Sequence, residues 1–83
     1  MLKSYVAFDI ETTGLNPQEN EIIEIGALKV RDGKVADRFI EFIHPTVSIA
    51  PAITALTGIT DEMVSGARSR CQVVSDFLDF CED

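Results

Sequence analysis

The dipeptide Asp32-Gly33 lies between two runs of alternating hydrophobic residues and restricts the fold of this 83-residue chain more than any other feature. Glycine readily adopts the positive φ angle of a two-residue turn, so the pair predicts a tight β-hairpin. Side chains alternate along a strand, so residues 22–31 present three apolar side chains on one face. These are Ile23, Ile25 and Ala27. Residues 34–43 are expected to pair back against this strand.

A further strand is expected over residues 5–10, where a hydrophobic run leads up to Ile10. The sequence Asn16-Pro17 predicts a turn after it, and the polar residues 18–21 are expected to be exposed. Together with the hairpin, this strand predicts a three-stranded antiparallel meander.

The second half of the chain predicts two short helices and one amphipathic helix. The first spans residues 51–56 and ends at Gly58, and the second follows Thr60 as its N-cap. Ser69 and Gln72 have the spacing of a capping box that opens the third. Its apolar stripe is Val73, Val74, Phe77, Leu78 and Cys81. The fold class is therefore α/β, and Cys71 and Cys81 are expected to be reduced cysteines packed in the interior.

Two carboxylates, Asp9 and Glu11, stand one residue apart at the end of the first strand. They share a face, whereas Ile10 points into the core. Close carboxylates repel unless a proton or a cation lies between them, and Mg²⁺ prefers oxygen ligands. Such a pair also occurs on solvated strand ends, but the hydrophobic run before it favours half of a Mg²⁺ or Mn²⁺ site.

Four segments, residues 9–15, 22–27, 44–45 and 56–62, resemble the DEDD superfamily of 3′–5′ exonucleases in order and spacing. The similarity is to its DEDDh type, such as the proofreading exonucleases of bacterial DNA polymerase III. The resemblance implies a ribonuclease-H-like fold, in which residues 1–83 form the N-terminal part of a single exonuclease domain. It also implies hydrolysis of phosphodiester bonds at a single-stranded or frayed 3′ end of DNA, with RNA left open.

The resemblance assigns a role to each matching residue. Asp9 would bridge two metal ions, and Glu11 would bind the ion that activates water. The residues expected beside the terminal nucleotide are Thr12, Thr13 and Gly14 at its sugar and phosphate, Leu15 at its base, and Leu56 and Thr57 at the base pocket. Many relatives have histidine at the position of Thr57, so the contact there differs from theirs.

The second and third motifs of the family, which supply two further aspartates and a general base, are not among these 83 residues. We therefore expect negligible exonuclease activity from this chain alone. Further strands pair along the first strand in the resembled fold, so we expect self-association or a domain swap through the first strand or the last helix. For the parent protein, the resemblance leaves three alternatives open: a separate proofreading subunit of a polymerase, part of a polymerase, or a repair nuclease.

Other polar residues leave alternatives open. Glu24 either lies near the acid pair or is a solvated or locally paired glutamate. His44, which precedes Pro45 at a strand end, is expected to have a structural or surface role. The acids of the last helix are expected on its solvated face; they are Asp76, Asp79, Glu82 and Asp83.

The formal net charge of −7 argues against a broad phosphate-binding surface and keeps a second function open, a non-catalytic exonuclease-like interaction module. A sugar-kinase or actin-like ATPase would need glycine at position 11, because Glu11 would repel the nucleotide. No apolar run could span a bilayer and no signal peptide is recognisable, so no membrane partner and a cytoplasmic location are expected.

Overall fold

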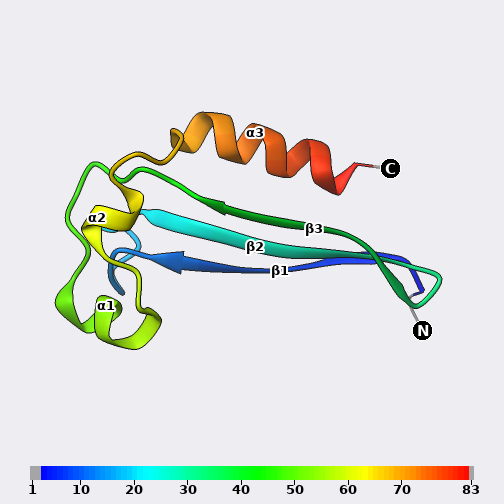
Figure 1. Ribbon diagram of the computed structural model, residues 1–83, viewed down its shortest axis with the longest axis horizontal. Helices are drawn as coiled ribbons and strands as arrows, with labels where there is room; N and C mark the ends of the chain where they lie inside the picture. The colour runs from blue at the N-terminus through cyan, green and yellow to red at the C-terminus, as the bar shows by residue number, and fades with distance from the viewer. Residues whose placement is uncertain (1–2, 83) are drawn as a thin grey trace.

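The computed structural model describes residues 3–82 and shows an antiparallel sheet followed by three helices (Figure 1). The elements are β1 (Tyr5–Thr12), β2 (Ile22–Arg31), β3 (Lys34–Phe42), α1 (Pro51–Thr57), α2 (Asp61–Val64) and α3 (Arg70–Cys81). The strand order is β1-β2-β3, which confirms the predicted meander and the α/β class. Compared with the prediction, β1 continues two residues further, α1 one residue further, and β3 ends one residue earlier.

The β2–β3 hairpin turns at Asp32-Gly33, as predicted. Both residues have positive φ angles, 51° and 78° respectively, which glycine adopts without steric cost and aspartate tolerates. Further along the sheet, Ala27 of β2 lies opposite Phe8 of β1 and Phe39 of β3. These three side chains share one face, because directly paired residues point the same way.

The core consists of two hydrophobic clusters that β2 connects. Ile23 packs in the first with buried residues from the helical half; these are Ile49, Ile53, Ile59 and Val64. Ile25 packs in the second with Ile43 and Val73. The period of two along β2 thus anchors both α1–α2 and α3 to the same strand.

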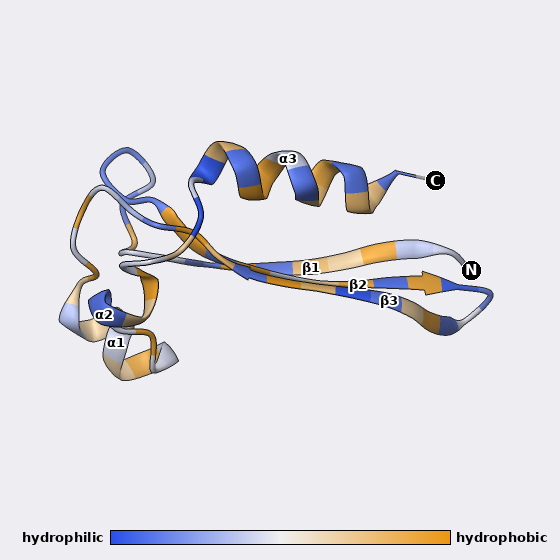
Figure 2. Ribbon diagram, turned by 45° about the horizontal axis from the view of Figure 1, so that its top comes forward, coloured by the Kyte–Doolittle hydropathy of each residue, from blue (hydrophilic) through white to orange (hydrophobic). Residues whose placement is uncertain are grey.

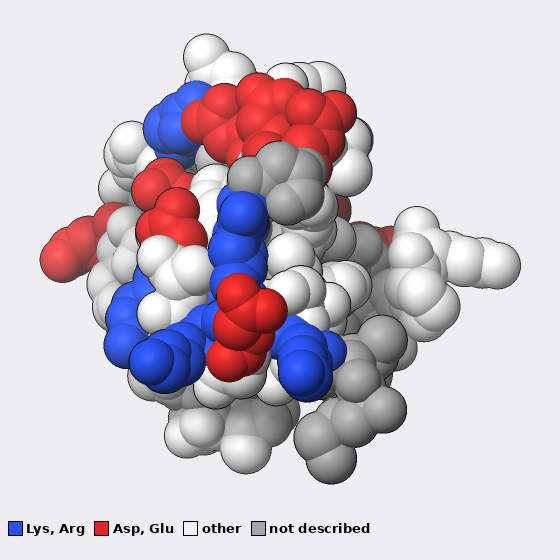
Figure 3. Space-filling model, turned by 90° about the vertical axis from the view of Figure 1, so that its right-hand side faces the viewer, with Lys and Arg blue, Asp and Glu red and all other residues white. Residues whose placement is uncertain are grey.

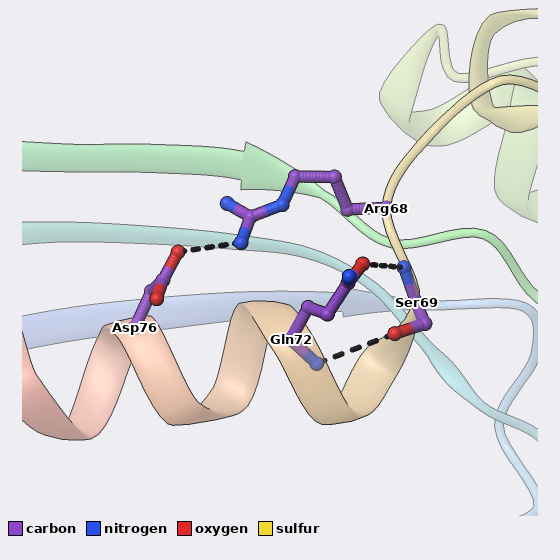
Figure 4. A network of polar contacts seen from close by, with 4 residues as sticks. All are labelled: Arg68, Ser69, Gln72 and Asp76. Carbon is purple, nitrogen blue, oxygen red and sulfur yellow. Dashed lines mark hydrogen bonds and ion pairs between the residues drawn. The ribbon is translucent and has the colours of Figure 1, made fainter.

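The start of α3 is fixed by polar contacts that Figure 4 shows from close by. The Ser69 hydroxyl accepts from the Gln72 backbone N–H, and the Gln72 side chain accepts from the Ser69 N–H, both at 3.3 Å. Arg68 forms an ion pair with Asp76 at 2.7 Å. The predicted capping box is therefore present.

Aromatic rings hold α3 against the sheet. The ring centroid of Phe77 lies 5.3 Å from that of Phe8 and 5.7 Å from that of Phe39. Phe80 contacts Phe39 as well, and the Lys29 ammonium lies 4.6 Å from the Phe80 ring centroid. Hydrophilic and hydrophobic residues alternate along α3 in Figure 2, as an amphipathic helix requires.

The prediction that the two cysteines pack in the interior is wrong. Cys71 and Cys81 are both exposed, and Leu78 of the predicted stripe is 59% exposed. The contacts with the sheet are made by Val73, Phe77 and Phe80. Cys81 lies in the last turn of α3 and lines an open hollow with Tyr5 and Val30, so the sheet does not bury it.

Charges and apolar groups are unevenly distributed on the surface. At the hairpin end of the molecule, acidic side chains gather over α3, whereas Lys and Arg side chains lie around the sheet (Figure 3). The sheet face opposite α3 carries Ile40, which is 68% exposed, and Leu28. None of the helices within residues 3–82 has the length and apolar character needed to cross a membrane.

The same substitution is expected to reduce stability by different amounts on the two faces of the sheet. Ile23→Val removes a methylene from a fully buried side chain and should lower the free energy of unfolding by about 1 kcal/mol. Ile40→Val removes the same group from the exposed face and should change it much less. Urea denaturation followed by circular dichroism measures both, and equal losses would contradict this description of the core.

Candidate metal site

The side chains of Asp9 and Glu11 lie on the sheet face opposite α3, because they alternate with Phe8 and Ile10 along β1. Two residues along a strand correspond to about 7 Å between their Cα atoms. Asp9 is exposed and Glu11 is half-buried. The ion pairs found between described residues involve neither acid. The predicted shared face is therefore present, with both carboxylates accessible to a cation. The prediction that Ile10 points into the core is wrong, because Ile10 on edge strand β1 is 38% exposed.

A third carboxylate lies on the same face. Glu24 of β2 is paired directly opposite Glu11. Burial raises the pKa of the Glu24 carboxyl above its usual value, and repulsion from Glu11 and then Asp9 raises it further. The alternative left open by the sequence is thereby decided: Glu24 lies beside the acid pair.

The space next to Asp9 is open. Gly26 lies opposite Asp9 in the ladder, and a Cβ atom there would meet nothing within 4 Å. A shallow hollow of about 390 Å³ follows this part of the sheet. Its lining includes Ala7, Asp9, Gly26, Leu28 and Ile40. Glycine therefore leaves room beside the first acid where any other residue would project a side chain.

The donor atoms fit Mg²⁺ or Mn²⁺, which take hard oxygen ligands and retain water molecules. Within residues 3–82, no group of three acidic, histidine or cysteine side chains is close enough to hold a metal ion. Asp9 and Glu11 would thus supply two carboxylates, and Glu24 acts on them through its charge. Other ligands would have to be water or groups outside this set.

The turn after β1 is fixed by internal hydrogen bonds. The Thr12 hydroxyl donates to the Gly14 carbonyl oxygen at 2.6 Å. Thr13 is completely buried, and its backbone N–H donates to the Glu21 carbonyl oxygen at 2.9 Å. The Thr13 N–H is therefore not available to an anion. Asn20 and Glu21, expected to be exposed, are half-buried because they complete this turn.

A second loop is tied to this turn. The Glu21 carboxylate accepts from the Thr46 backbone N–H at 3.0 Å and from the Thr46 hydroxyl. These bonds hold the pKa of Glu21 below its usual value. The Ala50 N–H donates to the Thr13 carbonyl oxygen at 2.8 Å, which brings the start of α1 beside the end of β1 (Figure 1).

The other predicted contact residues differ in their accessibility. Leu15 is 92% exposed and Leu56 is 81% exposed. The Thr57 hydroxyl donates to the Ile53 carbonyl oxygen and accepts from the Ile59 N–H, so it serves the end of α1. His44 has a ring nitrogen 3.0 Å from the Val64 carbonyl oxygen, which fits the structural role expected of it.

The burial of Glu24 and its repulsion by Glu11 and Asp9 predict a pH-dependent gain in stability for Glu24→Gln. Because folding raises the Glu24 pKa above 4.5, the penalty of its charge is absent below that pH and grows as the pH rises through the folded-state pKa. At pH 7 the variant should be more stable than the wild type by about 0.5 kcal/mol. Denaturant unfolding at pH 4 and pH 7 tests this, with Glu19→Gln in an exposed loop as the control. A gain that is equal at both pH values would contradict the electrostatic explanation.

Known proteins share both the sequence and the fold of this chain. The family model described as Exonuclease (RNase_T) matches residues 6–83. The PolC-type DNA polymerase III of Streptococcus mutans is 45% identical over 80 residues, which is 96% of this chain and 6% of the polymerase. That of Clostridium perfringens is 47% identical over 76 residues, 92% of this chain and 5% of the polymerase. The chain thus spans about one-twentieth of these relatives.

Solved structures lead to the same family. The nuclease domain of 3′hExo, a DEDDh family member bound to rAMP, superposes with a TM-score of 0.80 at 27% identity, covering 94% of this chain and 43% of that one. Exonuclease X in complex with 5′ overhanging duplex DNA gives 0.79 at 29% identity, covering 88% and 42%. The shared fold is of the ribonuclease-H-like class, as predicted. The chain belongs to the DEDDh exonuclease family.

Proposed function

We propose that this chain carries the first metal-binding motif of a metal-dependent 3′–5′ exonuclease that hydrolyses phosphodiester bonds at DNA 3′ ends. The observation that carries the proposal is the position of Asp9 and Glu11 on one open face at the end of β1, with no ion pair between either acid and another described residue. A pair of unneutralised carboxylates is a destabilising arrangement that a bound cation relieves.

The relatives favour DNA and a role in proofreading or repair. Polymerases are 45% and 47% identical to this chain, whereas a solved 3′-exonuclease that recognises a histone mRNA stem-loop is 27% identical. We therefore propose a frayed or single-stranded DNA 3′ end as the substrate, and a polymerase as the protein with which the site works. A test of the substrate should compare a DNA 3′ end with an RNA 3′ end.

The chain's own residues would bind and orient the substrate and the ions. Two bound divalent ions would lower the pKa of the attacking water and stabilise the leaving oxygen. Asp9 and Glu11 would supply carboxylate oxygens to them. Leu15 and Leu56, both highly exposed, would contact the terminal base, while Thr12 and Gly14 would shape the turn beside its sugar and phosphate.

A general base is missing from the described site. His44 is engaged with the Val64 carbonyl oxygen, and Tyr5 lies four residues before Asp9, about 13 Å along the strand. We therefore propose that these residues work as part of a larger exonuclease domain and that the chain alone has negligible activity. The proposal includes the cytoplasmic location expected from the sequence.

Binding of Mn²⁺ tests the proposal directly. Mn²⁺ should broaden the backbone amide NMR signals around Asp9 and Glu11, and Asp9→Asn should abolish this local broadening because it removes one of two charged ligands. Asp79→Asn on the exposed side of α3 should leave it unchanged. The affinity is expected to be in the millimolar range, as for weak sites built from few carboxylates.

Two results would overturn the metal site: broadening centred on the acidic end of α3, or broadening at β1 that survives Asp9→Asn. Either would favour the non-catalytic interaction module, for which the net charge of −7 is the supporting observation. Single-turnover cleavage of 3′-ended DNA by the pure chain with Mn²⁺ would contradict the proposed need for a larger domain.

We also propose that the chain self-associates through the free edge of β1. β1 is an edge strand, and the Ile10 N–H finds its acceptor in the neighbouring Asp9 side chain at 3.0 Å. Phe8 on this strand is 61% exposed. An edge strand with unpaired backbone groups and apolar side chains is a template for pairing with a second chain.

A lysine on this edge should block such pairing. Ala7→Lys places a charge on exposed β1 and should shift the chain toward monomer in light scattering, because a charge on an edge strand opposes pairing. Leu56→Lys on α1 is the matched control and should leave the assembly unchanged. A wild-type chain that is monomeric at working concentration, or an Ala7→Lys variant that still associates, would refute the proposal.

A further inference from the structure

We propose that Asn20 is a positioning residue of the acid pair, which fixes the turn after Glu11 and so sets how Asp9 and Glu11 present their carboxylates to a divalent cation. The inference rests on the proposed function, because it takes these two acids as the cation ligands. It assigns a role to a residue that the sequence predicted only to be exposed and polar.

The regular ladder stops at the second acid. Glu11 pairs with Glu24, but Thr12 pairs with Ile22, so the register shifts between Glu11 and Thr12. A register shift leaves a backbone position unpaired and bends the strand. The direction of the chain at Glu11 therefore depends on how the following residues are held.

Thr13 is the anchor of those residues. Its side chain is completely buried. The hydroxyl accepts from the Glu21 N–H at 3.0 Å and donates to Asn20 Oδ1 at 2.9 Å. A buried hydroxyl needs an acceptor for its proton, and Asn20 is the residue that supplies one.

Asn20 is itself held firmly. Its backbone N–H and its Nδ2 both donate to the Asn16 carbonyl oxygen, each at 2.9 Å. Asn16 in turn uses its Oδ1 to accept from the Gln18 N–H at 3.0 Å. The Asn20 side chain thus bridges the turn over residues 16–20 and the buried Thr13.

The same side chain packs against Gly14. A Cβ atom at position 14 would lie 2.6 Å from Asn20 Oδ1 and 2.8 Å from Asn20 Cγ, which is closer than atoms can approach. Glycine at this position therefore allows the amide of Asn20 to lie directly against the backbone. Asn20 contacts both of the residues that follow Thr12, by a hydrogen bond to one and by packing on the other.

Mn²⁺ titration of four variants tests the inference, with broadening of the Asp9 and Glu11 amide signals as the readout. Asn20→Ala and Thr13→Val each break the same hydrogen bond, so each should weaken Mn²⁺ binding about tenfold, as loss of a residue that orients a metal ligand does. The double variant should bind Mn²⁺ no more weakly than the weaker-binding of the two single variants, because the effects of two substitutions that break the same bond do not add. Thr13→Ser keeps the hydroxyl and should retain wild-type affinity.

Val73→Ala on α3 separates a purely structural role from positioning, because it removes volume from a fully buried side chain of the other hydrophobic cluster and lies outside the turn after β1. It should bind Mn²⁺ as the wild type does. Unchanged affinity in folded Asn20→Ala overturns the inference, as does loss of affinity in Val73→Ala. If Asn20→Ala does not fold, equal affinities of Thr13→Val and Thr13→Ser overturn it. If the wild type itself fails to bind Mn²⁺, the proposed function fails, and the positioning role falls with it.

Discussion

The pairing of β2 with both of its neighbours is the constraint on which the rest of the structure depends. One face of β2 is apolar and anchors both hydrophobic clusters through Ile23 and Ile25. Because side chains alternate along a strand, the same pairing sends Glu24 and Gly26 to the opposite face, where they meet Glu11 and Asp9 of β1. A shift of one residue in this register would bury the acids and expose the core. The core therefore determines the position of the candidate site.

The end of β1 is held mainly by hydrogen bonds from side chains. Beyond Glu11 the backbone is held by side chains instead of by a regular ladder. The Thr13 hydroxyl, the Asn20 amide and the Glu21 carboxylate each satisfy backbone or side-chain partners from other segments. A buried hydroxyl that lost its partner would cost about 1–3 kcal/mol, so these bonds select one conformation of the turn. The site thus combines a rigid strand with a loop whose geometry depends on a few polar groups.

Local signals made most of the fold predictable. The Asp32-Gly33 turn, the Ser69 capping box and the left-handed Gly58 at the end of α1 all depend on neighbouring residues alone. Predictions that needed the packing of α3 on the sheet were less successful. Phe80 contacts Phe39 whereas Cys81 is exposed, and this difference depends on how α3 lies on the sheet, which residues within one turn of a helix do not encode.

The candidate site was likewise predictable only where neighbouring residues determine it. The shared face of Asp9 and Glu11 follows from the period of a strand, so the sequence alone predicted it. The position of Glu24 required the register between β1 and β2, which a pattern of isoleucines on one strand does not specify. The importance of Asn20 was hidden for a similar reason, since a polar residue after a turn signal is normally solvated. The sequence did not single out Asn20, because the burial of Thr13, which creates the need for an acceptor, is known only from the structure.

The three acids on one face lower the stability of the sheet. Glu24 is the most costly of them, since burial and the charges of Glu11 and Asp9 all raise its pKa. A sheet selected only for stability would place neutral or basic residues at these paired positions, because like charges opposite each other destabilise a sheet. The chain instead keeps them on a face where Gly26 leaves open space beside Asp9. A divalent cation held between Asp9 and Glu11, as proposed, would turn the repulsion on this face into attraction. The register that builds the core thus also places three like charges side by side.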